Sequence, residues 1–138
     1  MTKNDFQQLT RIRLKEARLL LTNGLYEGAY YLAGYAVECA IKACIAKNVR
    51  RYDFPDKKLA NESHSHDLEQ LIRVAGLQNK LNTELRTNRQ FELNWAIAKD
   101  WSEQTRYSTL IPAIRAGEFY SALTSRQNGI MTWLRNQW

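Results

Sequence analysis

Apolar residues recur at helical spacing along most of this chain, and the alternation typical of strands is almost absent. The most apolar stretch is 25–47, LYEGAYYLAGYAVECAIKACIAK, which is interrupted by Glu27, Glu38 and Lys42. A helix that is apolar on nearly every side must be surrounded by protein. Its many glycines and alanines allow neighbouring helices to approach the backbone closely. The pattern therefore predicts that 25–47 is the central helix of a compact helical bundle.

A first helix is expected to begin near Asn4 or Asp5, whose side chains can cap it. Asn23 and Gly24 are typical of a helix end, and the central helix follows almost at once. These two helices should therefore pack as an antiparallel hairpin. Residues 49–65 contain a proline and mixed charges without apolar spacing, so they are predicted to form a loop.

Two further helices are predicted in the middle of the chain. A short helix, LEQLIRV, follows Asp67 and should end at Gly76. Residues 80–101 have helical spacing again, with an expected break around Thr87 and Asn88. Both segments have one apolar face, which is typical of helices that pack against a core.

The last third of the chain is expected to hold a connection and one more helix. The connection covers 101–117 and contains Pro112, which cannot lie in a helix interior without breaking it. The last helix should begin at about Glu118 and continue towards the end, with Gly129 inside it as the mark of a kink or a close contact. The chain is thus predicted to be all-α, with five helices in one domain, 1–138.

The net positive charge of the chain favours polyanionic partners in general. The chain has 138 residues and a net charge of +6, which is modest for a dedicated nucleic-acid binder. The dense basic group consists of Lys47, Arg50 and Arg51, with Lys57 and Lys58 shortly after it. This group is either a binding patch or a solvated helix end in which cations complement the helix dipole.

Several classes of protein are disfavoured by what the sequence contains. Charged residues near the amino terminus interrupt any export signal, and no stretch approaches the roughly 20 apolar residues that span a bilayer. Cys39 and Cys44 lie five apart in one predicted helix and cannot bridge, which suits a reducing cytoplasm. Gly-rich phosphate loops are absent, and no metal or cofactor is predicted. We expect a cytoplasmic protein without a membrane partner.

The order of several segments resembles the HEPN family of small helical proteins. These segments are ARLLLTNGLYEGAYYLAGYAVECAIKACI, SHDLEQLI, WSEQTRYS and the amphipathic last helix. The resemblance implies an up-and-down bundle of four long helices plus a short one, usually a homodimer with a polar groove between subunits. Short stand-alone members are often encoded beside nucleotidyltransferases, so a nucleotidyltransferase-type partner and a toxin–antitoxin-like system are implied as well.

Many HEPN proteins are ribonuclease toxins whose signature is Arg-x4-6-His, and this chain departs from that signature. The nearest arginine before His64 is Arg51, which is too distant, and the region that normally carries the motif offers Arg106 and Tyr107 without a histidine. Cleavage needs a group that exchanges a proton near neutral pH, and arginine cannot supply it. The resemblance therefore favours a dimeric module that binds nucleotide or RNA without cleaving it. The alternatives are a divergent metal-independent ribonuclease using His64 or His66 and a non-catalytic protein-interaction module.

Arg106 and Tyr107 are the main candidates for a phosphate site. An arginine fork can grip a phosphate while a base stacks on a neighbouring aromatic ring. The structural alternative is that Arg106 forms an ion pair with Glu38 or Glu103, and that Tyr107 completes the core. Both interpretations remain open from the sequence.

Charged residues of the central helix and the histidines have structural alternatives too. Glu38 and Lys42 lie one helical turn apart, so they can pair with each other, with Arg106, or across a dimer groove. His66 precedes a helix, where Ser65 or Asp67 can act as the cap, and a metal site there would need further ligands. The predicted phosphate-binding set, with no catalytic and no metal-binding residue, is Arg106, Tyr107, Lys42, Glu38, Arg50, Arg51 and His66.

Overall fold

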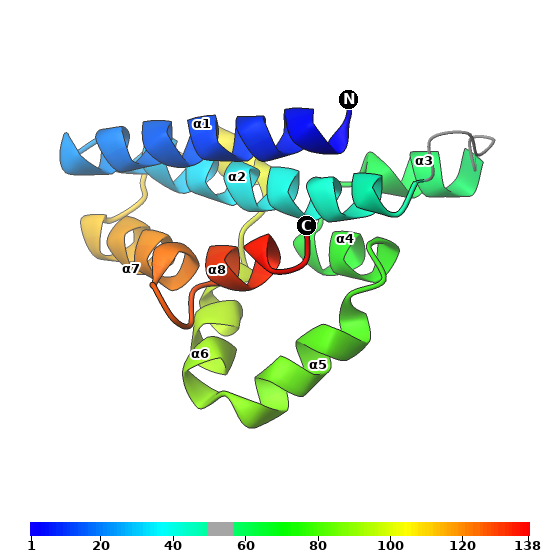
Figure 1. The fold of residues 1–138 in the computed structure, drawn as a ribbon. Helices are drawn as coiled ribbons and strands as arrows, with labels where there is room; N and C mark the ends of the chain where they lie inside the picture. The colour runs from blue at the N-terminus through cyan, green and yellow to red at the C-terminus, as the bar shows by residue number, and fades with distance from the viewer. Residues whose placement is uncertain (50–56) are drawn as a thin grey trace.

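A computed structural model describes residues 1–49 and 57–138, and all regular elements within these ranges are helical (Figure 1). The prediction of an all-α bundle is confirmed. In chain order the elements are α1 (Lys3–Thr22), α2 (Tyr26–Lys47), α3 (Lys57–Ser63), α4 (Leu68–Val74), α5 (Gln78–Thr87), α6 (Arg89–Ala98), the 3-10 helix η1 (Glu103–Tyr107), α7 (Ala113–Thr124) and α8 (Ile130–Arg135).

The α1–α2 hairpin lies along one side of the molecule, as the sequence predicts (Figure 1). Its first helix is capped by Thr2 rather than by Asn4 or Asp5. The Thr2 hydroxyl accepts a hydrogen bond from the Asp5 amide (3.1 Å), and the Asp5 carboxylate accepts one from the Thr2 amide (2.8 Å). This reciprocal capping box lowers the pKa of Asp5 through its hydrogen bonds to Thr2. Gly24, with a φ of +76°, makes the turn into α2.

The helix α2 is the centre of the bundle. Every residue from Ala36 to Ile41 is buried, and α2 packs against α1, α4, α7, α8 and η1. This arrangement confirms the prediction made from its apolar sequence. In Figure 1, α7, α8 and α4 lie against the α1–α2 hairpin, and α5 and α6 lie on the far side of them.

The predicted loop 49–65 is wrong in part, because residues Lys57–Ser63 form α3. This helix has no buried residue, so its sequence lacks the apolar spacing that reveals a packed helix. The next predictions are confirmed. Asp67 caps α4 by accepting a hydrogen bond from the Gln70 amide (3.2 Å), and Gly76 follows the helix with a φ of +73°.

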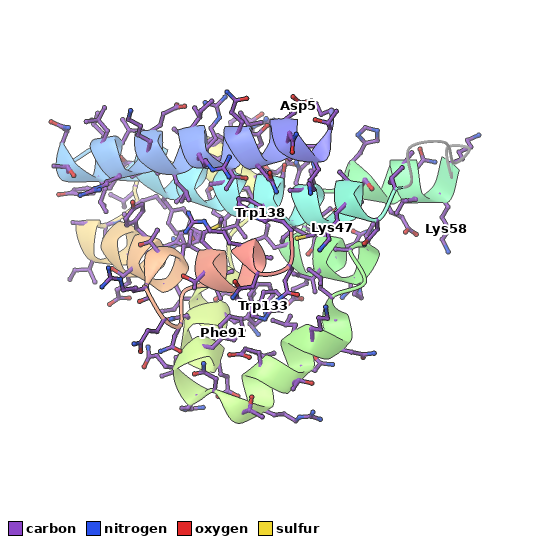
Figure 2. All side chains as sticks on the ribbon, viewed as in Figure 1. Asp5, Lys47, Lys58, Phe91, Trp133 and Trp138 are labelled. Carbon is purple, nitrogen blue, oxygen red and sulfur yellow. The ribbon has the colours of Figure 1, made fainter. Side chains whose placement is uncertain are left out.

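The break expected within 80–101 is confirmed at Asn88, which ends α5 and caps α6. Its side-chain oxygen accepts a hydrogen bond from the Phe91 amide (3.1 Å). Phe91 then packs against Trp133 of α8, with ring centroids 5.6 Å apart (Figure 2). The bend at Asn88 therefore brings α6 into the core.

The last third of the chain differs most from the prediction. The connection 101–117 contains η1, and α7 begins at Ala113, directly after Pro112, because proline is well tolerated where a helix begins. The predicted last helix is divided between α7 and α8, and Gly129 lies between them rather than inside a helix. The expected close contact is confirmed, since a Cβ atom on Gly129 would lie 2.4 Å from the Ser125 carbonyl oxygen.

These differences explain the number of helices. Five were predicted, whereas the described residues contain eight α-helices. The fourth and the last predicted helices are each divided in two, and α3 lies in the segment assigned to a loop. No helix within the described ranges is long and apolar enough to cross a bilayer.

Candidate functional site

A buried carboxylate, Glu38, lies at the centre of the candidate site. Its side chain is only 2% exposed although it sits in the most apolar helix of the protein. Lys42, one turn later in α2, donates a hydrogen bond from Nζ to Glu38 Oε2 (3.2 Å). The predicted pairing of these two residues is therefore confirmed, and it offsets part of the large penalty of burying a charge.

His66 supplies the second partner of Glu38. Its Nδ1 lies 2.8 Å from Glu38 Oε1, and its Nε2 lies 3.2 Å from Glu103 Oε2 at the start of η1. The result is a continuous series of contacts, Lys42–Glu38–His66–Glu103, which we call the charged chain. The charged chain joins α2 to η1 through His66, which lies just before α4.

The position of η1 depends on Trp101, which is buried against Gly34 of α2. A Cβ atom at position 34 would lie 2.1 Å from the indole ring, so only glycine lets the ring come this close. Tyr31 stacks on the same indole, with centroids 6.2 Å apart. Within the described part of the chain, the indole Nε1 is buried without a hydrogen-bond partner. Nothing in the sequence pattern around Gly34 or around Trp101 indicates that these two residues are in contact.

Arg106 and Tyr107 form an exposed pair at the end of η1. The Arg106 Nη2 donates a hydrogen bond to the Tyr107 hydroxyl (2.8 Å), and the guanidinium carbon lies 4.7 Å from the ring centroid. The hydrogen bond to Tyr107 raises the pKa of Arg106. The alternative in which Tyr107 completes the core is wrong, since this residue is 68% exposed.

The structure also decides between the partners considered for Arg106. Among residues 1–49 and 57–138, the ion pairs of Glu38 are with Lys42 and His66, and that of Glu103 is with His66. An ion pair of Arg106 with either carboxylate is therefore not formed. Among the described residues, the hydrogen bond to Tyr107 uses one of the five N–H donors of the guanidinium, and most of the others have no protein acceptor there.

A cavity of about 460 Å³ lies beside the charged chain, between the start of α4, the end of α6 and η1. Its lining includes His66, Asp100, Trp101 and Glu103. Carboxylates outnumber ammonium groups there, because Lys99 is the one lysine against four acidic residues in the lining. An anionic ligand is thus disfavoured inside this cavity. The exposed guanidinium of Arg106 is better suited to bind an anion.

Two other candidates from the sequence, Lys47 of the basic group and His64, lie outside the charged chain. Lys47 donates a hydrogen bond from Nζ to the Gln137 carbonyl (3.0 Å) and lies beside the carboxyl end (Figure 2). Arg50 and Arg51 lie outside the described residues. His64 is exposed and comes directly after α3. The structure thus brings together Glu38, Lys42 and His66, and joins them to η1.

Among the described residues, the histidines, cysteines and carboxylates form no cluster that could hold a metal ion. Cys39 and Cys44 are buried free thiols. Burial raises the pKa of each of them to about 11. These thiols are therefore protonated near neutral pH, and neither is activated as a nucleophile.

Comparison with known proteins places this architecture in a family. No curated protein and no solved structure matches the chain. The family model described as the HEPN domain matches residues 10–136, which extend from within α1 to the end of α8. The matched region includes the whole charged chain and the Arg106–Tyr107 pair. The chain therefore belongs to the HEPN domain family.

Proposed function

We propose that this protein is a cytoplasmic, dimeric HEPN module that holds the phosphate groups of RNA or nucleotides without cleaving them. The observation that carries the proposal is the Arg106–Tyr107 pair. Its guanidinium is exposed, ordered by the tyrosine, and without an ion-pair partner in the described ranges. Such a guanidinium can bind a phosphate through two parallel hydrogen bonds.

Tyr107 adds a surface for a base. The guanidinium of Arg106 covers one face of its ring, and the residue as a whole is 68% exposed. Stacking of a base on an aromatic ring contributes about 1–3 kcal/mol and tolerates any sequence. The net charge of +6 favours the approach of a polyanion. These features support single-stranded RNA, with nucleotides as smaller ligands of the same chemistry.

The position of His66 supports binding rather than cleavage. Both of its ring nitrogens contact carboxylates of the protein, and among the described residues no contact joins the ring to Arg106 or Tyr107, the groups proposed to hold the RNA. Glu38 and Lys42 serve in this proposal as the buried support of the site and not as ligands of the phosphate, because they satisfy each other and His66.

Exposed apolar residues near the pair support association with a second copy. Leu110 is 83% exposed and Ile114 is 74% exposed, and both lie in the segment between η1 and the first turn of α7. Burial of such side chains contributes about 25 cal/mol for each Å² removed from water. We propose that two copies meet through this segment, so that their two arginines face one groove. A nucleotidyltransferase-type protein encoded nearby, in a toxin–antitoxin-like system, is the proposed wider partner.

The test is fluorescence anisotropy with a labelled short single-stranded RNA at low and at high salt. Arg106→Ala should raise the Kd on the order of tenfold, since charge-assisted hydrogen bonds contribute about 1.5–3 kcal/mol. The matched control is Arg86→Ala, which removes an exposed arginine that contacts a hydroxyl within its own helix, α5. Equal weakening by both substitutions would show a nonspecific charge effect and contradict the site.

Three further measurements complete the test. RNA recovered after incubation should be intact, and cleavage that Arg106→Ala abolishes would make the protein a ribonuclease instead. Sedimentation should show a dimer, and a monomer at every concentration would refute the proposed assembly. Absence of binding to RNA, ATP and GTP at low salt would overturn the phosphate site as a whole.

A further inference from the structure

We propose that His66 is a proton-controlled tether that fixes η1, and the Arg106–Tyr107 pair on it, to the central helix α2. The effect of this tether on RNA binding rests on the function proposed above. Its effect on η1 itself does not, because the mobility of η1 can be measured in the free protein. His66 is thus a positioning residue for the candidate site and does not contact the ligand.

The two contacts of His66 require a particular protonation state of its ring. Nδ1 of His66 lies 2.8 Å from an oxygen of Glu38, and Nε2 lies 3.2 Å from an oxygen of Glu103. An ionised carboxylate only accepts hydrogen bonds, so each nitrogen needs its own proton. The doubly protonated, positively charged ring is the form that satisfies both contacts.

The neutral ring has to give up one of these two contacts. A neutral imidazole keeps one N–H, and its other nitrogen presents a lone pair. The Glu38 side chain is 2% exposed, so water cannot replace the donor that it would lose, whereas the Glu103 side chain is 31% exposed. A buried acceptor that loses its donor is destabilising, because no water replaces the lost hydrogen bond. The remaining proton therefore stays on Nδ1, and Glu103 turns towards water.

Through this contact, Glu103 holds η1 in place. It is the first residue of η1, and η1 has no buried residue of its own. Among the described residues, the Glu103–His66 contact is the one side-chain hydrogen bond or ion pair that joins η1 to another element. The hydrogen bonds of Gln104, Thr105 and Arg106 are all formed within residues 102–107. Trp101 anchors the chain before η1 and stays buried. Loss of the tether therefore loosens η1 locally without unfolding it.

Several charged side chains surround His66 and its two carboxylate partners. Asp67 and Glu69 belong to the start of α4, Lys99 and Asp100 to the end of α6, and Lys42 to α2. Beyond Glu38, Arg13 of α1 and Tyr35 and Cys39 of α2 lie close enough to interact with one another electrostatically. Histidine is the side-chain type whose ordinary charge change falls between about pH 5 and about pH 8. His64 is the other histidine, and no contact joins its ring to the charged chain in the described residues.

The experiment measures backbone mobility of η1 by the heteronuclear NOE of its amide groups, at about pH 5 and about pH 8. In the free wild-type protein, η1 should be rigid at the lower pH and more mobile at the higher pH. Glu103→Gln should be rigid at both. Its carboxamide accepts a hydrogen bond from a protonated Nε2 and donates one to the lone pair of the neutral ring. His64→Gln is the matched control and should behave as the wild type does.

RNA binding is measured on the same three proteins, because phosphodiester groups do not change charge in this pH range. The wild type and His64→Gln should bind the labelled RNA roughly two- to fivefold more tightly at the lower pH, as expected for a partly exposed ion pair of about 0.5–1 kcal/mol. Glu103→Gln should bind equally at both pH values.

The outcomes separate the tether from the proposed function. An NOE for η1 that does not change with pH in the wild type, or that changes equally in Glu103→Gln, would overturn the tether. If RNA binding still depended on Arg106 in that case, the proposed function would stand. The expected NOE pattern without RNA binding at either pH would establish the tether and refute the function proposed for the pair.

Discussion

Gly34→Ala tests the contact that places η1. In a helix interior, replacing glycine by alanine usually stabilises by about 1 kcal/mol. At this position the added Cβ would lie 2.1 Å from Cε2 and Nε1 of Trp101 and 2.3 Å from Cδ1. Carbon atoms pack at about 3.5–4.0 Å, so the indole has to move by more than about 1 Å. We therefore expect a gain in helix propensity that is outweighed by the displacement of Trp101.

The magnitude follows from how firmly Trp101 is held. The residue is buried, and Tyr31 stacks on its ring, so the indole has no free space to enter without disturbing neighbours. Overpacking of a close-packed interior costs about 1–3 kcal/mol, and this contact belongs at the upper end. After the gain in helix propensity, the net loss in the free energy of unfolding is about 2 kcal/mol. The melting temperature should fall by about 8 °C in a domain of this size.

Urea denaturation followed by far-ultraviolet circular dichroism measures this loss. Gly28→Ala is the matched control in the same helix, because its Cβ would meet the flexible end of Leu20 at 3.1 Å. That variant should be as stable as the wild type or slightly more stable. If Gly34→Ala proves as stable as Gly28→Ala, Trp101 does not pack on the backbone of α2, and the account of how η1 is placed is wrong.

Two other expectations concern the folded state as a whole. Gly117→Ala in α7 should raise the free energy of unfolding by up to about 1 kcal/mol, since nothing lies within 4 Å of the added Cβ. Gly129→Ala should lower the free energy of unfolding, because its Cβ would lie 2.4 Å from a backbone oxygen. Urea denaturation of both variants checks this contrast, and equal effects would contradict it. The buried thiols should lower stability in alkali, because burial raises the pKa of Cys39 and Cys44 from 9.0 to about 11 while unfolded thiols ionise at lower pH. Their contribution to stability is present below about pH 9 and is lost as the pH rises towards about 11. A Cys39→Ala, Cys44→Ala variant should therefore lose less stability over this pH range than the wild type. An identical loss in both proteins would refute the assignment.

Local signals in the sequence predicted much of the fold. The apolar density of α2 requires burial on all sides, and the spacing of Glu38 and Lys42 predicts their pairing within that helix. Asp67 is predicted to cap a helix and does so, and the break predicted around Asn88 is found there. Each of these predictions depends on neighbours within about one helical turn, which the sequence displays directly.

Other features depend on tertiary contacts that leave no periodic sign. The helix α3 has no buried residue, so apolar spacing could not reveal it. The break between α7 and α8 includes Gly129, whose fit between backbone atoms of Leu123 and Ser125 arises only after the chain folds back. The pairing of Gly34 with Trp101 likewise joins two elements far apart in sequence. A glycine in a helical pattern indicates a close approach but does not identify the partner.

The partner of Glu38 shows how such a missed contact changes the functional interpretation. From sequence, Arg106 was a reasonable partner for a buried carboxylate, because such a charge needs a hydrogen-bonded cation. In the structure, Lys42 and His66 meet that need, and His66 reaches Glu38 across 28 residues of sequence. Arg106 is therefore not required to neutralise the core, and it lies at the surface against Tyr107 instead. The proposed phosphate site depends on this division of roles, since a guanidinium bound to Glu38 would have few donors left for a ligand.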